Sequence, residues 1–329
     1  MSPYMAPSTH YIFPVLSVLT PYLLIANFLF LIYWILFPNR FVLLPLVTLL
    51  LGFGTMKRHF NYFSSKAIDQ EVSSAFTISS ININSGQYLR KDSQTLDQEK
   101  YQSLLDWTKL QANTDIICAQ EKRYFGQVML DSMLLDDYTR HGNIEISTGI
   151  YTRHPIVDSG FIDVGGRPSI VAWADIKLPF GKIIRVYSLH CSSNMISRKS
   201  QELIEESNLR RDNLFDEVKG LFANYAYYSK QRNSQLDRLE VHMDKSPYPV
   251  VVAGDFNDVP QSYLHHRMAK KYIDVFNEKG RGVGATYRTL PGLRIDYIYT
   301  DESITPTFFA VDDVDISDHY PIRAQLVLE

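Results

Sequence analysis

Polar and ionisable side chains stand at the ends of several apolar, strand-like runs of this sequence. The stretch I-S-D-H-Y-P-I places Asp318 beside His319 just before the last apolar run, and V-V-V-A-G-D-F-N-D carries Asp255 and Asn257. Asp and Asn after a strand are ordinary turn-forming residues, so either stretch alone is as compatible with a simple turn as with a reactive site. An acid next to an imidazole can also accept and donate protons, which makes the Asp-His turn a candidate for catalysis.

Four further apolar runs end in side chains of the same kinds. S-I-N-I-N carries two amides, A-Q-E a carboxylate, S-L-H an imidazole and R-I-D-Y-I another Asp. A carboxylate at the end of an apolar strand requires a partner, and a divalent cation, which prefers oxygen ligands, is a suitable one. A single histidine in such a place is more often structural, but the joint pattern predicts that the strand ends converge on one polar rim. The residues are Asn82, Asn84, Glu121, His190 and Asp296.

The charge distribution separates the first 59 residues from the rest of the 329-residue chain. No Asp or Glu occurs among them, and their only basic residues are Arg40, Lys57 and Arg58. The remaining 30 basic residues face 36 acidic ones, a balance that argues against a strongly non-specific nucleic-acid binder. Cys118 and Cys191 each lie beside an apolar run, so a disulfide framework is not expected.

Two apolar runs open the chain. Residues 11–37 carry no charge and exceed the roughly 20 residues that a bilayer-spanning helix requires. Residues 41–55 are shorter and fit a span through a thinned bilayer, or a re-entrant or interfacial helix. A cleaved signal peptide and a buried core helix are competing interpretations of the first run, although no basic segment precedes it and a second apolar run follows at once. The sequence predicts a membrane anchor of one or two helices at 1–59 and a linker at 60–74.

The side of the membrane that the C-terminal part occupies stays open. Lys57, Arg58 and Lys66 flank the second run, and the positive-inside rule favours a cytoplasmic C-terminal part if both runs cross. A second run that does not cross, or a further helix upstream of Met1, would reverse this orientation.

Short β-rich runs alternate with helical stretches over residues 75–329. Residues 96–111 have helical spacing. Residues 201–243 are long, charged and helical, as expected of two helices around a Tyr-rich centre. We expect these tyrosines to pack in the domain and not to stack on nucleic-acid bases. The runs between the helical stretches predict a layered α/β domain with a large core that includes Trp107. We therefore expect a catalytic domain at 75–329 with a helical insertion at about 197–245.

In their order along the chain, the motifs resemble those of the endonuclease/exonuclease/phosphatase family, which has the deoxyribonuclease-I-like fold. G-D-F-N-D followed by S-D-H-Y-P is the specific part, and the four shorter motifs complete the series. P-Q-S-Y after G-D-F-N-D-V, and G-A-T-Y before R-I-D-Y-I, look like the membrane-anchored bacterial branch. The resemblance covers about residues 75–328 and implies a two-sheet α/β sandwich flanked by helices, anchored in a bacterial inner membrane.

The resemblance also implies a metal and a nucleophile. Glu121, together with Asn82 and Asp318, would hold Mg²⁺, with Mn²⁺ as an alternative. Asp255 would orient or deprotonate the attacking water, and Asn257 would bind a phosphate oxygen.

The phosphate contacts are implied in the same way. His319, oriented by Asp296, would contact the scissile phosphate, and His190 would bind phosphate or assist the leaving group. No acidic partner of His190 is evident in the sequence, and Ala285 stands where a larger polar or basic side chain is expected. Further substrate contacts would come from Asn84, Thr286 and Arg294.

The function that the resemblance implies is hydrolysis of phosphate esters by a membrane-anchored, divalent-metal-dependent enzyme. We expect a phosphodiesterase of the endonuclease type, which would bind a nucleic-acid backbone along the rim. A phospholipid or phosphoinositide hydrolase is the alternative, because an anchor in the bilayer would hold the site near lipid headgroups. A non-catalytic, membrane-bound binding module is disfavoured because Glu121, Asp255 and His319 are all present, but the fold alone does not decide among these functions.

Overall fold

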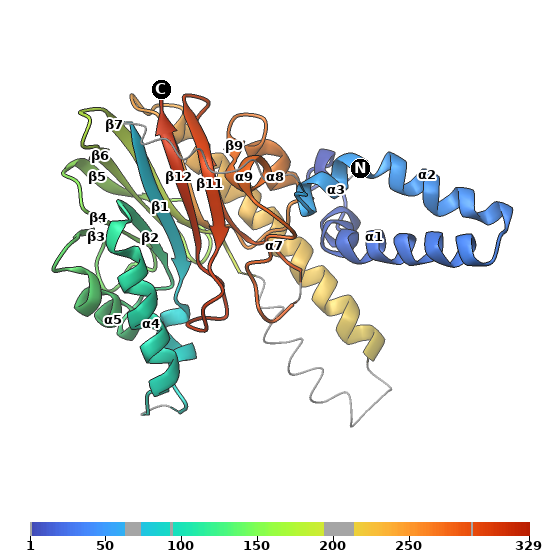
Figure 1. Ribbon diagram of the computed structural model, residues 1–329, viewed down its shortest axis with the longest axis horizontal. Coiled ribbons are helices and arrows are strands. Elements are labelled where there is room, and N and C mark those ends of the chain that lie inside the picture. Colours follow the sequence, from blue (N-terminus) through green and yellow to red (C-terminus); the bar gives the residue numbers. More distant parts are fainter. Residues whose placement is uncertain (1, 63–73, 93–94, 194–213, 291) are drawn as a thin grey trace.

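Two six-stranded β-sheets stacked on one another form the body of the protein (Figure 1). The structure is a computed structural model that describes residues 2–62, 74–92, 95–193, 214–290 and 292–329. Helices cover the outer face of each sheet, so the two-sheet α/β sandwich expected from the sequence is confirmed.

The first sheet has the strand order β11–β12–β1–β2–β4–β3. β1 and β2 are parallel and lie at its centre, while the other pairs are antiparallel. The strands are β1 Ala75–Asn82, β2 Ile116–Gln120, β3 Thr139–His141, β4 Gly149–Thr152, β11 Ile304–Val311 and β12 Ile322–Leu328.

The second sheet has the order β5–β6–β7–β8–β10–β9 and again a central parallel pair, β7 and β8. β6 and β7 form a hairpin through the L-P-F-G turn, as the sequence indicated. The two central pairs face each other across the sandwich, β1 opposite β8 and β2 opposite β7. The strands are β5 Ile156–Asp163, β6 Ile170–Lys177, β7 Ile183–His190, β8 Val250–Asp255, β9 Ile273–Asp274 and β10 Asp296–Thr300.

Alternation of side chains along the strands builds three apolar layers. Ile78 of β1 and Val251 of β8 point between the sheets and are fully buried. In the first sheet, side chains that alternate with these point outward and are covered by α4 (Gln98–Leu110) and α5 (Phe125–Leu134). Trp107 of α4 is fully buried in this outer layer, as predicted.

The other outer face is covered by α7 (Leu214–Met243) and α8 (Tyr263–Met268), and α9 (Val275–Lys279) packs beside β11 at the edge of the sandwich. The sequence predicted two helices around the Tyr-rich centre of the insertion; in the part of it that the structure describes, α7 is one continuous 30-residue helix that runs through this centre. Tyr225 near its middle is buried, in agreement with a packing role. Residues 197–213 of the predicted insertion lie outside the described residues.

The N-terminal residues form a helical hairpin that projects from the sandwich (Figure 1). α1 (Ile12–Leu36) leads away from it, and α2 (Leu43–Leu51) and α3 (Phe53–His59) lead back. In the described part of the chain, α1 is the helix long and apolar enough to cross a membrane by itself, and little of it is buried. α2 and α3 meet that test only as a broken span with a bend of 60°. Short 3-10 turns, Ser2–Tyr4 and Arg40–Val42, complete this segment.

Both ends of the hairpin are docked on the sandwich. Val15 and Ser17 in the first turns of α1 are 4% and 1% exposed, and α1 packs against α7. At the other end, Asn61 pairs through its backbone with Gly282, and its amide donates to the carbonyl of Phe276. The first positions of the predicted linker therefore lie against the domain, and 63–73 are outside the described residues.

Candidate active site

The central strands of both sheets end at the same edge of the sandwich. β1 ends at Asn82 beside the last residue of β2, and Glu121 follows β2 directly. In the other sheet, β7 aligns His190 with Asp255 of β8, and β10 aligns Asp296 with the same residue. Because the two central pairs face each other, strand register brings these five side chains together.

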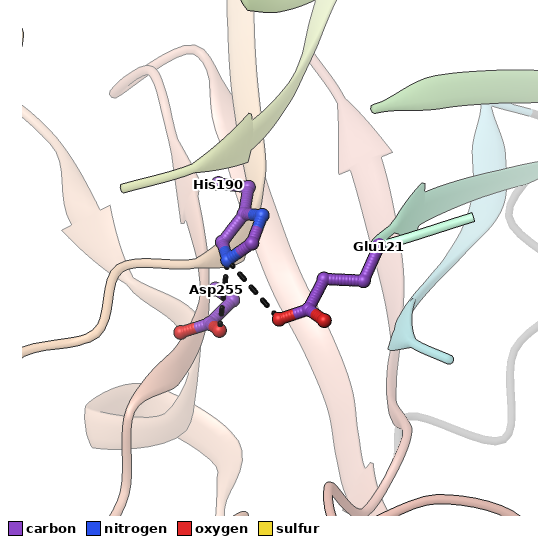
Figure 2. A group of neighbouring side chains, drawn as sticks. All are labelled: Glu121, His190 and Asp255. Carbon is purple, nitrogen blue, oxygen red and sulfur yellow. Dashed lines mark ion pairs between the residues drawn. The ribbon is translucent and has the colours of Figure 1, made fainter. Parts of the chain in front are cut away.

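Asn82, Glu121, His190 and Asp255 form one cluster. The Asn82 amide donates to Glu121 Oε1 at 3.1 Å and to Asp255 Oδ2 at 3.0 Å. Figure 2 shows the Nε2 atom of His190 pointing toward the same two carboxylates. It lies 3.4 Å from Glu121 Oε1 and 3.7 Å from Asp255 Oδ2. Its Nδ1 lies 3.2 Å from the hydroxyl of Ser147, whereas the buried Nε2 has no hydrogen-bond partner. The acidic partners of His190 that the sequence did not reveal are therefore Glu121 and Asp255.

His319 and Asp296 form a second cluster that shares Asp255 with the first. His319 Nδ1 lies 2.9 Å from Asp296 Oδ2, and its Nε2 lies 3.9 Å from Asp255 Oδ2. The ring of Tyr287 packs edge-on against the imidazole, with the ring centres 5.1 Å apart. The Asp255 carboxylate is thus flanked by two imidazoles.

The environment shifts the pKa values of the two imidazoles in opposite directions. Burial lowers the pKa of His190, although the charge of Glu121 partly opposes this effect. Burial acts in the same direction on His319, but Asp296 and Asp255 outweigh it and raise its pKa well above the ordinary value. At neutral pH the site therefore combines a neutral imidazole with an imidazolium.

Asp255 itself is almost completely buried. Burial raises its pKa to about 8, against the opposing charge of His319 and with the added repulsion of Asp296. The backbone N–H of Asn257 donates to Asp255 Oδ1 at 2.8 Å, and its side-chain amide donates to Oδ2 at 2.9 Å and to the carbonyl of Cys191 at 3.1 Å. Asn257 thus orients Asp255 in addition to lining the pocket.

The loops at this edge have an unusual backbone. Every non-glycine residue of positive φ in the described ranges lies in the loops that follow β1, β2 and β8. Such conformations cost about 1–3 kcal/mol each and are found preferentially at functional sites. The residues are Asn84, Ser85, Glu121, Tyr124 and Asn257.

A buried lysine holds the loop that carries Glu121. Lys122 is fully buried, and its Nζ donates to Gln127 Oε1 at 2.8 Å and to the carbonyls of Asn143 and Ile146 at 2.7 and 3.2 Å. These contacts tie Glu121 to the loop that carries Ser147. Nothing in the sequence indicated this role of Lys122, because the carbonyls it binds lie more than 20 residues away along the chain.

A buried ion pair from α7 holds the loops that follow β7 and β8. Arg232 Nε lies 3.2 Å from Asp258 Oδ2, and its Nη1 donates to the carbonyl of Ser192 at 3.2 Å. Tyr225, on the same helix, donates its hydroxyl to Asp258 Oδ1 at 2.6 Å and also lines the pocket. Asp258 belongs to the G-D-F-N-D motif, but nothing in the sequence indicated Arg232 as its partner.

A pocket opens beside the two clusters, and a second hollow lies on the other side of Glu121. Asn84 and Asp318 line the pocket. In the described residues, however, the Asp318 carboxylate does not belong to either group of acidic and imidazole side chains that lie close enough together to bind one ion. The pocket also has an apolar wall, made of Val18, Val259, Leu290, Leu293 and Ile295.

The structure corrects the substrate-binding prediction for Arg294. Its side chain is 2% exposed, donates to both oxygens of Asp274 at 3.0–3.1 Å and donates to the backbone carbonyl of Arg58 at 3.1 Å. The guanidinium lies between the rings of Phe276 and Tyr297. It therefore joins α3 to the catalytic domain and does not face the pocket.

Thr286 is likewise structural. It is fully buried, and its hydroxyl accepts hydrogen bonds from the backbone N–H groups of Ile295 and Asp296 at 3.0 and 3.1 Å. The hydroxyl thus fixes the start of β10, where Asp296 stands, and is not available to a substrate.

The donor set of the first cluster fits a hard divalent cation. Glu121 and Asp255 supply carboxylate oxygens, and Asn82 supplies an amide that already bridges them. A third carboxylate, Asp296, adds negative charge that a cation would offset. Amide nitrogen and oxygen are exchangeable by a rotation of the Asn82 side chain, which would turn its oxygen toward an ion.

Comparison with known proteins agrees with this geometry. The sequence model of the Endonuclease/Exonuclease/phosphatase family matches residues 79–319. The chain belongs to this family. It is a hydrolase that acts on phosphate ester bonds. A second model, described as a domain of unknown function, matches residues 1–59. No curated protein matches the chain in sequence.

Solved structures share the fold at low sequence identity. A functionally unknown conserved protein from Enterococcus faecalis V583 is 16% identical, with a TM-score of 0.55 over 77% of this chain and 100% of that chain. A humanized TDP2 from D. rerio is 17% identical, with a TM-score of 0.56 over 77% and 99% of the two chains. The mannosyl-6-phosphatase Bt3783 from Bacteroides thetaiotaomicron VPI-5482 is 16% identical, with a TM-score of 0.53 over 77% and 100%.

The position of Arg294 generates a test of its role. Arg294→Met would leave the buried Asp274 carboxylate unpaired, so we expect the free energy of unfolding to fall by about 3–5 kcal/mol. Urea unfolding of the full chain in detergent measures this change. Arg281→Met, at an exposed position, is the matched control and should change it by less than about 0.5 kcal/mol. A raised KM with unchanged stability in Arg294→Met would instead indicate a substrate contact.

Proposed function

We propose that this family member is a membrane-tethered, divalent-metal-dependent phosphodiesterase whose nucleophilic water is handled by Asp255. The observation that carries the proposal is the Asp255 carboxylate, held by Asn82 and Asn257 between a neutral and a charged imidazole. Hydrolysis of a phosphodiester requires an activated water, neutralisation of charge on the phosphate and help for the leaving oxygen. The two clusters contain a candidate group for each of these tasks.

Glu121 and Asn82 would hold the cation in this proposal, Mg²⁺ or alternatively Mn²⁺, with the Asp255 carboxylate beside it. Asp318, which lines the pocket, would add negative charge at its rim. A cation bound there would polarise the phosphate and offset the negative charge of the site. Asp255 orients the water and accepts its proton, and Asn257 keeps the carboxylate in place for that transfer.

The two histidines contact the phosphate from different sides. His319, kept charged by Asp296, binds a phosphate oxygen as negative charge builds up on it. In this proposal the proton of the neutral His190 imidazole sits on Nε2, which faces the Glu121 and Asp255 carboxylates, and Nδ1 accepts a hydrogen bond from the hydroxyl of Ser147. That Nε2–H has no other acceptor and can donate to the leaving oxygen or to the phosphate. Asn84 contributes an amide at the rim.

The hairpin acts as a membrane tether in this proposal. Beyond the docked first turns, residues 19–36 of α1 would extend about 27 Å, close to the roughly 30 Å of a bilayer core. The hairpin begins and ends at the sandwich (Figure 1). This supports placing the N-terminus and the catalytic domain on the same side of the membrane. Lys57 and Arg58 lie near the domain and Arg40 near the far turn, so the positive-inside rule favours the cytoplasmic side of a bacterial inner membrane.

Removal of the charge of Asp255 tests the catalytic proposal. We expect Asp255→Asn to lower kcat for bis(p-nitrophenyl) phosphate by at least about 100-fold, because the amide cannot accept the proton of water. EDTA should abolish the activity of the unsubstituted chain, and added Mg²⁺ should restore it. Nicking of supercoiled plasmid, measured in parallel, tests a nucleic-acid substrate.

Asp136→Asn is the matched control, because this exposed Asp lies away from the site. It should retain activity within roughly twofold. Full activity of a correctly folded Asp255→Asn variant would contradict the role of Asp255, and activity that persists in EDTA would contradict the role of the metal.

The proton on Asp255 predicts a pH dependence of metal binding. Because burial raises the pKa of this carboxyl to about 8, the metal-free protein holds the proton below that pH and a cation must displace it. The apparent affinity for Mn²⁺ should therefore fall by roughly tenfold per pH unit below 8 and level off above it. Titration of Mn²⁺ followed by electron paramagnetic resonance measures this. An affinity that does not change between pH 6 and pH 8 would contradict the prediction, and Asp255→Asn should flatten the curve.

The hairpin predicts that the N-terminus and the catalytic domain lie on one side of the membrane. Epitope tags placed before Ser2 and after Glu329 should be digested together, or protected together, in inverted vesicles treated with protease. A single-pass anchor would leave one tag protected while the other is cut. Release of the chain from membranes by carbonate would argue against the tether.

A further inference from the structure

The apolar wall of the catalytic pocket is built partly from the N-terminal hairpin. Val18 of α1 packs with Leu290, Val259, Leu293 and Ile295, and all of these residues line the pocket that contains the catalytic groups. The catalytic domain alone would therefore leave this wall incomplete. A helix with the composition of a membrane span thus takes part in the substrate pocket.

The position of Val18 is set by the docking of α1. Pro14, Val15 and Ser17 are buried, and α1 packs against α7, which also supplies Tyr225 to the pocket. Beyond the docked turns, α1 presents large apolar side chains outward over the rest of its length. The wall of the pocket and the apolar surface of α1 are therefore parts of one helix, and a bilayer around α1 would lie next to the pocket.

The opposite side of the site has a different character. The hollow across Glu121 is lined by Arg123, Arg167, Ser147 and His190, and both arginines are exposed. Neither Lys nor Arg is among the described residues that line the pocket on the Val18 side. A nucleic-acid strand carries phosphates in both directions from the scissile bond and gains from cations on both sides. The site instead offers exposed arginines on one side, the charged imidazole of His319 at its centre, and a hydrophobic surface without Lys or Arg among its described residues on the other.

We propose that the substrate is a phospholipid: its acylated alcohol lies against the Val18 wall, and its polar headgroup lies toward Arg123 and Arg167. This assignment rests on the proposed phosphodiesterase function and names its substrate class. Water forms a bond to phosphorus while the bond to one ester oxygen breaks, and that alcohol leaves with the proton. The other half of the lipid is released as a phosphomonoester.

The test compares two substrates that share one headgroup and one phosphodiester. Dihexanoylphosphatidylglycerol below its critical micelle concentration carries short acyl chains, and glycerophosphoglycerol carries none. With the full chain in uncharged detergent and Mg²⁺, we expect kcat/KM to be at least roughly tenfold higher for the acylated substrate, because a few methylene groups are buried against the wall.

Two wall variants separate the pocket from simple partition of lipid into detergent. Val18→Asn and Leu290→Asn place an amide in the wall from two different elements, and each should lower the acylated-to-deacylated ratio by roughly three- to tenfold through KM. Leu16→Asn makes a matched change on the exposed face of α1 and should leave the ratio unchanged. If partition of lipid into detergent alone set the acylated-to-deacylated ratio, all three variants would change it equally.

The outcomes distinguish this inference from the proposed function. Equal kcat/KM for the two substrates, together with Asp255-dependent cleavage of bis(p-nitrophenyl) phosphate, would overturn the lipid assignment and leave the phosphodiesterase intact. Plasmid cleavage at a higher kcat/KM than either lipid substrate would overturn it in favour of nucleic acid. Failure to cleave any of these substrates would overturn both.

Discussion

The site depends on the burial of one carboxylate, that of Asp255. Burying a carboxyl group is costly unless hydrogen bonds and neighbouring charges replace the lost hydration, and the burial of Asp255 shifts its pKa toward the protonated form. Asn82 and Asn257 donate to it, and two imidazoles flank it. These groups come from both sheets, so the carboxylate can be accommodated only after the two parallel strand pairs have stacked. Assembly of the sandwich and assembly of the site are therefore one event.

The same burial separates the chemical roles of the two histidines. His190 has a hydroxyl on one side and Glu121 on the other, and desolvation keeps it neutral. His319 is equally buried but sits between Asp296 and Asp255, whose charges favour its protonated form. In the proposed mechanism these two environments provide a neutral imidazole donor and a charged imidazole within one site. Backbone strain in the loops after β1, β2 and β8 is offset by buried supports such as Lys122 and Arg232.

The hairpin is a structural part of the domain as well as a candidate anchor. Arg294 joins the end of α3 to Asp274, and the first turns of α1 pack against α7. Because both ends are docked, the hairpin has a defined position relative to the pocket, to which it contributes Val18. The proposed anchor would differ from a flexible tether, since it would shape the pocket as well as raise the local concentration of substrate.

The sequence by itself determined the family, the two-sheet sandwich and the residues at the strand ends. These features follow from local patterns, apolar runs that end in polar residues such as Asn82 and Glu121, and from motif order. It did not reveal the acidic partners of His190, the continuity of α7 through Tyr225 or the place of Val18 in the pocket wall. It also assigned Arg294 to substrate because a motif records which residues are present, not which way they point. Only tertiary structure decided these points, because strand register, helix docking and burial join residues that are far apart in the chain.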